Sequence, residues 1–223
     1  QIHWERTMKF KSLVAAAALA AATCIGGSVS AATVAGVISS ADDNDALGPL
    51  GLSDPLNGYY GGQLYLVGGS ADIQVSYLGA EAGNNNYFSF GSILFNTPGI
   101  ASWTAGGAQD TITVAAGLLS FWFGADQNAA SVTNGSNPDN TNPNLPNFFV
   151  SFLPDQNSTS GQSVLLFLDD GGGGSDDNHD DMVIRLTIVG GDGYIAPIPL
   201  PAGGLLLIGA LGGLAALRRR KSA

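Results

Sequence analysis

A series of short strand-like segments, separated by turn residues, constrains the fold of this chain more than any other feature. Residues 72–78 and 110–114 alternate polar and apolar side chains with the period of two expected of a half-buried strand. Residues 118–123 and 148–153 are almost continuously apolar, as buried strands are. The pattern predicts about nine short strands and no helix between the termini, and hence an all-β fold, an antiparallel β-sandwich or jelly roll.

Turn chemistry adds finer expectations. Residues 54–58, Asp-Pro-Leu-Asn-Gly, predict a turn, and residues 87–95 predict one strand that bends at Gly91. Residues 126–147 are rich in asparagine and proline and are expected to be irregular. Because they are long for a loop in a compact domain, they predict either an exposed functional loop or a disordered segment.

Charge is distributed very unevenly along the chain. Of 18 acidic residues only Glu5 lies outside residues 32–196, whereas Arg185 is the only base inside them, so this body carries a formal net charge of −16. Such a surface repels nucleic acid and anionic lipid, and both are excluded as partners. It favours divalent cations, although an acidic secreted protein adapted to salt explains the charge equally well.

The start of the chain predicts export. Residues 8–31 contain a basic segment, an alanine-rich apolar stretch and a small-residue cleavage site, so a signal peptide is expected to be cleaved after Ala31. Residues 1–7 precede Met8 and are interpreted as an upstream extension. Cleavage would remove Cys24 and leave residues 32–196 as one secreted acidic β-sandwich domain without a disulfide.

The end of the chain, residues 197–223, combines a proline motif, a short apolar span and a basic cluster. The motif is Pro197, Ile198, Pro199, Leu200, Pro201 and Ala202, and the cluster is Arg218, Arg219, Arg220 and Lys221. A helix over residues 202–217 would rise about 24 Å, which is short for a bilayer core of about 30 Å. The cations after it predict a transmembrane helix with a cytoplasmic C-terminus.

This three-part ending resembles the PEP-CTERM sorting signals, in their Val-Pro-Leu-Pro-Ala-type variant, with Ile198 in place of the valine. The resemblance covers residues 197–223 alone. It implies an exosortase and the secretion machinery as partners, transient anchoring in the inner membrane through the C-terminal helix, and then a place at the cell surface or in the extracellular matrix. The alternative is an ordinary C-terminal membrane anchor.

An acidic hairpin between the last two long strand segments is the one constellation in the body that suggests chemistry. Oxygen ligands at close spacing suit calcium, and four successive glycines allow the two groups of acids to approach each other. The predicted ligands are Asp169, Asp170, Asp176, Asp177, Asn178, Asp180 and Asp181. The hairpin resembles acidic turns near the end of many secreted bacterial β-domains; the alternative is a solvated acidic loop. Asp180 or Asp181 is also a candidate to pair with Arg185, and Asp181 is the better one because an offset of four residues along a strand places both side chains on one face.

The residue inventory argues against an enzyme. His179 lies among acids with no nucleophile motif nearby, and the glycine run precedes neither a helix nor a lysine, as a phosphate-binding loop would require. The sequence therefore predicts a non-enzymatic surface or matrix protein that calcium stabilises. The alternative is a calcium-dependent carbohydrate-binding or adhesion module, with exopolysaccharide as a candidate partner. A glycan hydrolase is the weaker alternative, because it needs only two carboxylates.

Overall fold

A computed structural model of the chain describes residues 34–126, 130–174 and 177–197. These residues belong to one compact unit of the chain. The predicted signal peptide, its cleavage site at Ala31 and the C-terminal sorting signal lie outside the described residues, except for Pro197. Within the described ranges no helix has the length and apolarity required to cross a bilayer.

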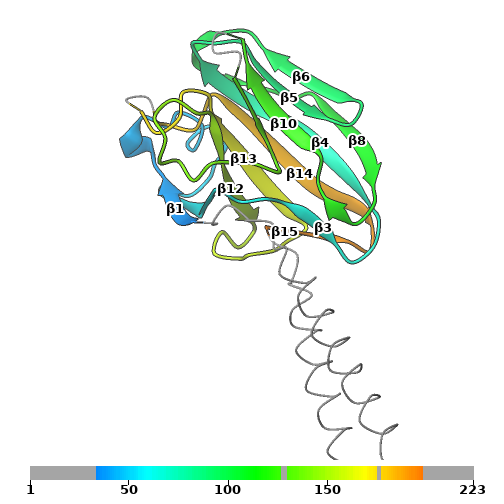
Figure 1. Cartoon of the computed structure of the whole chain (residues 1–223). Coiled ribbons are helices and arrows are strands. Elements are labelled where there is room, and N and C mark those ends of the chain that lie inside the picture. Colours follow the sequence, from blue (N-terminus) through cyan, green and yellow to red (C-terminus); the bar gives the residue numbers. More distant parts are fainter. Residues whose placement is uncertain (1–33, 127–129, 175–176, 198–223) are drawn as a thin grey trace, which may run out of the picture. The chain divides into compact units, whose positions relative to one another are not determined.

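The largest of three antiparallel sheets has eight strands. Figure 1 shows its central strands side by side. The order of strands in this sheet is β1 (Val34–Ile38), β2 (Leu56–Tyr60), β12 (Asn147–Leu153), β13 (Ser163–Asp169), β14 (Met182–Gly191), β4 (Ala71–Ala82) and β7 (Ile100–Ala105), and β8 (Gln109–Val114) also pairs with β4. The central strands β12, β13 and β14 carry long runs of buried residues, because both faces of the sheet are covered there.

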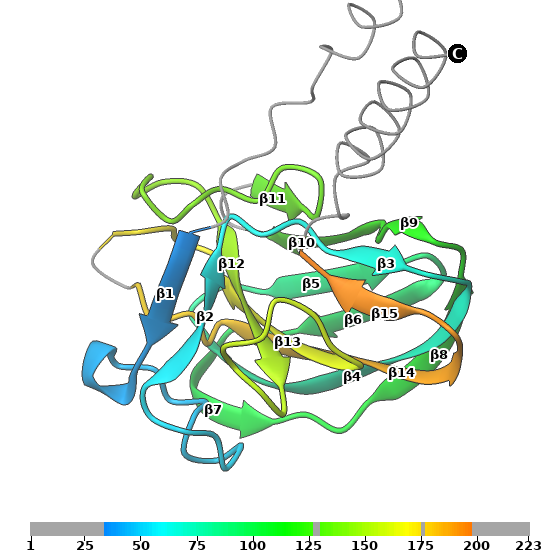
Figure 2. The ribbon, with the colours of Figure 1, turned by 90° about the horizontal axis from the view of Figure 1, so that it is seen from below.

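Two smaller sheets complete the body. One has the order β11 (Ala130–Thr133), β10 (Phe121–Ala125), β5 (Asn86–Phe90) and β6 (Ile93–Thr97). The other has β15 (Tyr194–Ala196), β3 (Tyr65–Val67) and β9 (Gly117–Leu118), of which β15 and β3 lie side by side in Figure 2. A three-residue 3₁₀ helix, η2 (Ser40–Asp42), is the only helix among the described residues.

Aromatic residues fill the core between the large sheet and the four-stranded sheet. Alternate residues of β10 and β5 point inward, so Phe121, Phe123 and Phe88 pack against one another and Phe121 and Phe123 also pack against Phe148 of β12. All four of these rings are buried. These rings therefore form part of the main core of the body.

The opposite face of the large sheet has a second, smaller core. Phe149, Leu165, Phe167 and Val183 project from β12, β13 and β14 and pack against apolar residues of the segment between β1 and β2, including Leu47. This segment lies over the end of the sheet at which β13 stops and β14 starts. The acidic hairpin joins the two strands at that end, so the second core borders the candidate site.

The all-β, antiparallel, sandwich-like architecture with almost no helix agrees with the sequence prediction, whereas the jelly-roll assignment stays a prediction. The number of strands was underestimated, because the described residues form fifteen. The expected turn at residues 54–58 is wrong, since Leu56–Tyr60 is strand β2. The residue at position 58 of this strand is a glycine because a Cβ there would lie 2.5 Å from the Phe149 ring.

Two further expectations need correction. Residues 87–95 form the hairpin of β5 and β6 rather than one bent strand, because Gly91 adopts φ +61 and the chain reverses there. Residues 126–147 are not wholly irregular, since Ala130–Thr133 is strand β11, paired with β10. Residues 134–146 are held by asparagine side chains: Asn134 and Asn137 are buried and bond to backbone groups of neighbouring segments.

Candidate metal centre

The candidate site lies where the acidic hairpin meets the second core. Asp169 ends β13 and pairs in register with Asn147, the first residue of β12. Alternation along the two strands places both side chains on the same face as Phe149 and Phe167. His179 comes from the other limb of the hairpin and packs against Phe149 and Tyr60, with ring centroids 6.3 and 5.3 Å away.

Three side chains converge at this point. Nδ1 of His179 lies 3.2 Å from Oδ1 of Asp177 and 4.0 Å from Oδ2 of Asp169. One ligand atom from each of the three residues lies within 4.8 Å of the others, which is close enough to hold a metal ion. Asp169 and His179 are completely buried, whereas the Asp177 side chain is 39% exposed.

A ring of hydrogen bonds fixes the proton positions around His179. The Asp177 carboxylate can only accept, so Asn140 directs its amide nitrogen to both Asp177 oxygens, at 3.0 and 3.1 Å. The Asn140 oxygen must then accept from the Asn147 amide, at 2.8 Å, which turns the Asn147 oxygen toward the imidazole. Nε2 of His179, 2.8 Å from that oxygen, is therefore the nitrogen that donates.

This assignment leaves three acceptors facing one another. In the neutral ring Nδ1 carries a lone pair, and it faces one oxygen each of Asp169 and Asp177. Nδ1 of His179 and Oδ2 of Asp169 are buried atoms without a hydrogen-bond partner in the protein. Buried acceptors without a donor are costly, so the arrangement calls for a cation, either a metal ion or a proton on Nδ1.

The pKa values of the two carboxyl groups move in opposite directions. Burial raises the pKa of Asp169 to about 6, although His179 and the N–H groups of Gly172 and Gly171 act against this shift. Burial also raises the pKa of Asp177, but the hydrogen bond and positive charge of a protonated His179, together with the Asn140 amide, outweigh burial, so the pKa of Asp177 is lowered when Nδ1 carries a proton. Asp177 is thus the candidate ligand that faces solvent as an anion. The buried Asp169 carboxyl ionises readily only when a cation lies beside it.

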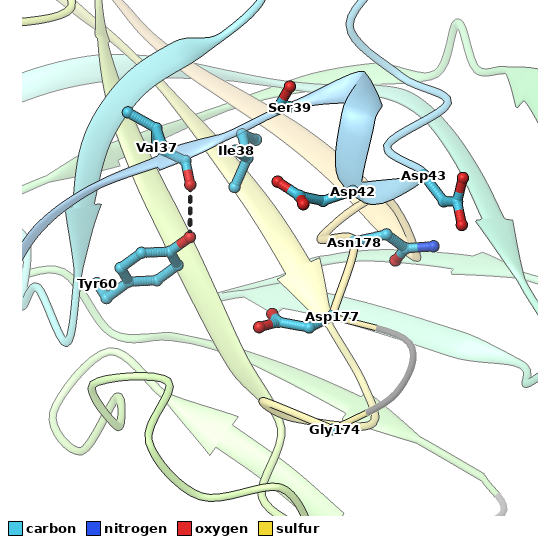
Figure 3. A pocket seen from close by; sticks show the side chains of 9 residues that line it. All are labelled: Val37, Ile38, Ser39, Asp42, Asp43, Tyr60, Gly174, Asp177 and Asn178. Carbon is cyan, nitrogen blue, oxygen red and sulfur yellow. Dashed lines mark hydrogen bonds between the residues drawn. The ribbon is translucent and has the colours of Figure 1, made fainter.

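A pocket of about 420 Å³ opens beside Asp177 (Figure 3). Asp42 and Asp43 also line it, together with Tyr60, whose hydroxyl donates a hydrogen bond of 2.8 Å to the Val37 carbonyl. Burial, followed by the charges of Asp177, Asp42 and Asp169, raises the pKa of Tyr60. The pocket is therefore acidic where it borders Asp177, and a cation is the species that its charge favours.

Unusual backbone conformations gather at the site. Among the described residues three non-glycine residues have positive φ, namely Asp43, Asn140 and His179, at 62°, 63° and 60°. One lines the pocket, one belongs to the ring of hydrogen bonds, and one is the nitrogen ligand. Such conformations are sparsely populated and tend to cluster at functional sites.

The glycine run joins the hairpin to the asparagine-rich segment. The N–H groups of Gly171 and Gly172 donate to Oδ1 of Asp169, at 2.8 and 2.7 Å. Gly172 adopts φ +75, and a Cβ there would lie 2.4 Å from the Leu145 carbonyl. The close approach that Gly172 permits brings Asn140 and Asn147 near the hairpin, and it explains why this segment contributes to the site.

The remaining predicted ligands are placed elsewhere, or outside the described residues in the case of Asp176. Asp170 accepts from the amides of Asn84 and Asn86, both at 2.8 Å, and its own N–H donates to Asp181 at 2.7 Å. Asp180 accepts from the backbone of Asp45. These contacts form a second polar network beside the first.

Asn178 lies in the wall of the pocket, and its carbonyl accepts from the amide of Asn44, at 2.6 Å. The expected Asp181–Arg185 ion pair does not form between these two described residues. Four residues along a strand separate them by about 13 Å, and Asp181 bonds to the Asp170 backbone instead.

The sequence did not identify His179 as a candidate metal ligand, and it did not identify Asn140 and Asn147 as the residues that orient its ring. His179 was considered for catalysis and set aside, although histidine is a common metal ligand and this one lies two residues from Asp177. The asparagines gave no comparable signal, because their role depends on the register of β12 against β13.

Comparisons with known proteins add little to this picture. No family model matches the chain, and no curated protein matches it. Among solved structures, the chain is similar to the C-terminal domain of the BC2L-C lectin from Burkholderia cenocepacia, with 12% identity over 58% of this chain and 97% of that domain. The TM-score is 0.36, which supports no inference about fold, ligand or activity.

Proposed function

We propose that this protein is a non-enzymatic, exported surface protein whose β-body binds a divalent metal ion through Asp169, Asp177 and His179. The observation that carries the metal site is the convergence of two carboxylate oxygens and an imidazole lone pair, two of these atoms buried and without a donor. The ion stabilises the body by joining the limb of the hairpin that carries Asp177 and His179 to Asp169 at the end of β13.

The donor set favours a first-row transition ion over the calcium expected from the hairpin's acids alone. Calcium takes six to eight oxygen ligands, whereas an imidazole nitrogen suits ions such as Zn²⁺, and mixed carboxylate ligands also suit Mn²⁺. Asn147 supports this assignment, because metal-bound histidines commonly donate their second nitrogen to a fixed oxygen. Mn²⁺ and Zn²⁺ are therefore the proposed ions.

The geometry of the site supports a structural role rather than glycan hydrolysis. Hydrolysis requires a sugar between two carboxyl groups that lie about 5 to 9.5 Å apart. Asp169 is completely buried, and its ligand oxygen lies within 4.8 Å of the ligand oxygen of Asp177. The spacing suits an ion, and a completely buried Asp169 presents no surface to a sugar ring.

Thermal unfolding of the purified full chain tests the metal site. After treatment with chelator, Mn²⁺ or Zn²⁺ at 100 times its Kd is expected to stabilise the fold by about 2.7 kcal/mol, or roughly 5–10 °C in Tm. Ca²⁺ and Mg²⁺ at the same concentration give a smaller rise. Asp169→Asn abolishes the rise, whereas Asp155→Asn, which changes an exposed acid elsewhere, leaves it intact.

An equal rise in the Asp169→Asn variant, or none with any of the four ions, would contradict the metal site and leave a proton as the cation. Export is tested separately by the location of the tagged chain with and without residues 197–223. We expect the full chain to reach the cell surface and the truncated chain to bypass the membrane-anchored stage. Cytoplasmic retention of the full chain would contradict the export proposal.

A further inference from the structure

The outward face of the four-stranded sheet differs from the other exposed surfaces of the body. Phe121 and Phe123 of β10 point into the core, so Trp122 and Gly124 point outward. Trp122 is 38% exposed, more than any other aromatic side chain among the described residues. Trp122 therefore does not fill the core.

The indole of Trp122 lies along the sheet, over Gly124. A Cβ on Gly124 would be 2.7 Å from Cζ3 of Trp122, so only glycine lets the six-membered ring rest there. The edge of the ring that carries Cζ3 is held against the strand, and 38% of the side chain is left to solvent. A fixed, flat aromatic surface of this kind loses little conformational freedom when a ligand stacks on it.

Hydroxyl and amide groups surround this ring. Ser89 and Thr133 stand directly opposite Trp122 on the two neighbouring strands, and Tyr87 stands opposite Gly124. The Tyr87 hydroxyl donates to Asp126 at 2.9 Å, and the Asn85 amide donates to the same oxygen at 2.8 Å. A carboxylate acceptor is thus fixed at the end of β10 on the side of the ring that Gly124 occupies.

Charge selects the class of ligand. None of the four strands of this sheet carries a charged residue, and Asp126 directly follows β10. The −16 charge of the body repels anionic polymers and also a second copy of the chain. A neutral polyhydroxylated ligand fits these conditions, because its apolar C–H faces stack on indole while its hydroxyls donate to carboxylate and hydroxyl oxygens.

We propose that the outward face of the four-stranded sheet binds a neutral glycan chain, with a sugar ring stacked on Trp122. This goes beyond the proposed function, and it needs no metal, because the ring and the fixed carboxylate belong to a different sheet from the metal centre. Leu94, 62% exposed on the same face, extends the apolar surface along the chain of sugars.

The test is retardation of the full chain in gels containing a neutral polysaccharide: cellulose ether, xyloglucan, mannan or dextran. Alginate and chitosan serve as the anionic and cationic comparisons. We expect retardation by at least one neutral polymer, unchanged by chelator, and a loss of affinity of about tenfold or more in Trp122→Ala. Trp122→Phe retains part of the affinity, and Val189→Ala, which removes an exposed apolar side chain of β14, retains all of it.

Four outcomes would overturn the proposal. One is failure of every neutral polymer at high protein concentration, and another is equal retardation of the Trp122→Ala variant with its thermal unfolding unchanged. The third is a dimer in sedimentation that Trp122→Ala converts to a monomer, which would assign the face to a second copy. Abolition of binding by chelator would instead move the ligand to the metal centre and equally exclude this face.

Discussion

Asp169 and Asp170 are neighbours in the sequence, both are buried, and yet they sit in opposite chemical situations. Each oxygen of Asp170 accepts an amide hydrogen, from Asn84 and from Asn86. Asp169 has one satisfied oxygen and one that faces the lone pair of His179 without a donor. A buried carboxylate that the protein satisfies needs no ion, whereas one that faces other acceptors does.

The largest expected effect comes from the satisfied carboxylate. Asp170→Ala removes the acceptor of the Asn84 amide and one of the two acceptors of the Asn86 amide, and it is expected to cost about 3 kcal/mol of unfolding free energy. The loss is the same in chelator and in Mn²⁺, as measured by denaturant unfolding. A loss seen only with Mn²⁺ would make Asp170 a part of the metal centre and remove the contrast between the two residues.

His179→Asn tests the Asp169 side of this comparison, because it removes the imidazole that faces Asp169. Asparagine tolerates the positive φ of this position, so the change removes the imidazole with little backbone cost. The stabilisation by Mn²⁺ at 100 times its wild-type Kd, about 2.7 kcal/mol, is expected to disappear, and unfolding in chelator separately measures the cost of removing a buried ring that packs against Phe149 and Tyr60. If the variant bound Mn²⁺ as tightly as wild type in calorimetry, the nitrogen would not be a ligand.

Asn140 tests whether the ring of hydrogen bonds positions the ligands. Asn140→Gly preserves the left-handed backbone and removes both the donor to Asp177 and the acceptor of Asn147. Partners of this kind typically contribute a factor of about 10 to 100 to metal affinity. Calorimetry with Mn²⁺ measures the change, and Asn142→Gly, in the same loop, is the control. Unchanged affinity would show that the ligands are positioned without the ring.

The strands follow from local pattern, and so does the acidic hairpin as the place where acids converge. What local pattern could not predict is the division of the acids into two networks. That division depends on the register that sets Asp169 opposite Asn147, and on strand β5, which supplies Asn86. Strand β2 was missed for a similar reason. Gly58 suggested a turn, but a glycine is needed there because a side chain would collide with the Phe149 ring, and that contact cannot be read from local sequence.

The smallest expected effect is a pH dependence of opposite sign with and without metal. Burial raises the pKa of Asp169 from 3.8 to about 6, so the folded state binds more protons than the unfolded state between these values. Without metal, the contribution of Asp169 to stability is therefore present in acid and lost as the pH rises through about 6. A metal ion binds the ionised carboxylate, so its affinity falls about tenfold per pH unit below that value.

Unfolding of wild type and Asp169→Asn at pH 5 and 7 isolates this residue. In Mn²⁺, acidification should reduce the difference between their unfolding free energies. In chelator, acidification should raise the unfolding free energy of wild type relative to that of the variant. The same sign in both conditions would mean that Asp169 is not the ligand that exchanges its proton for the ion.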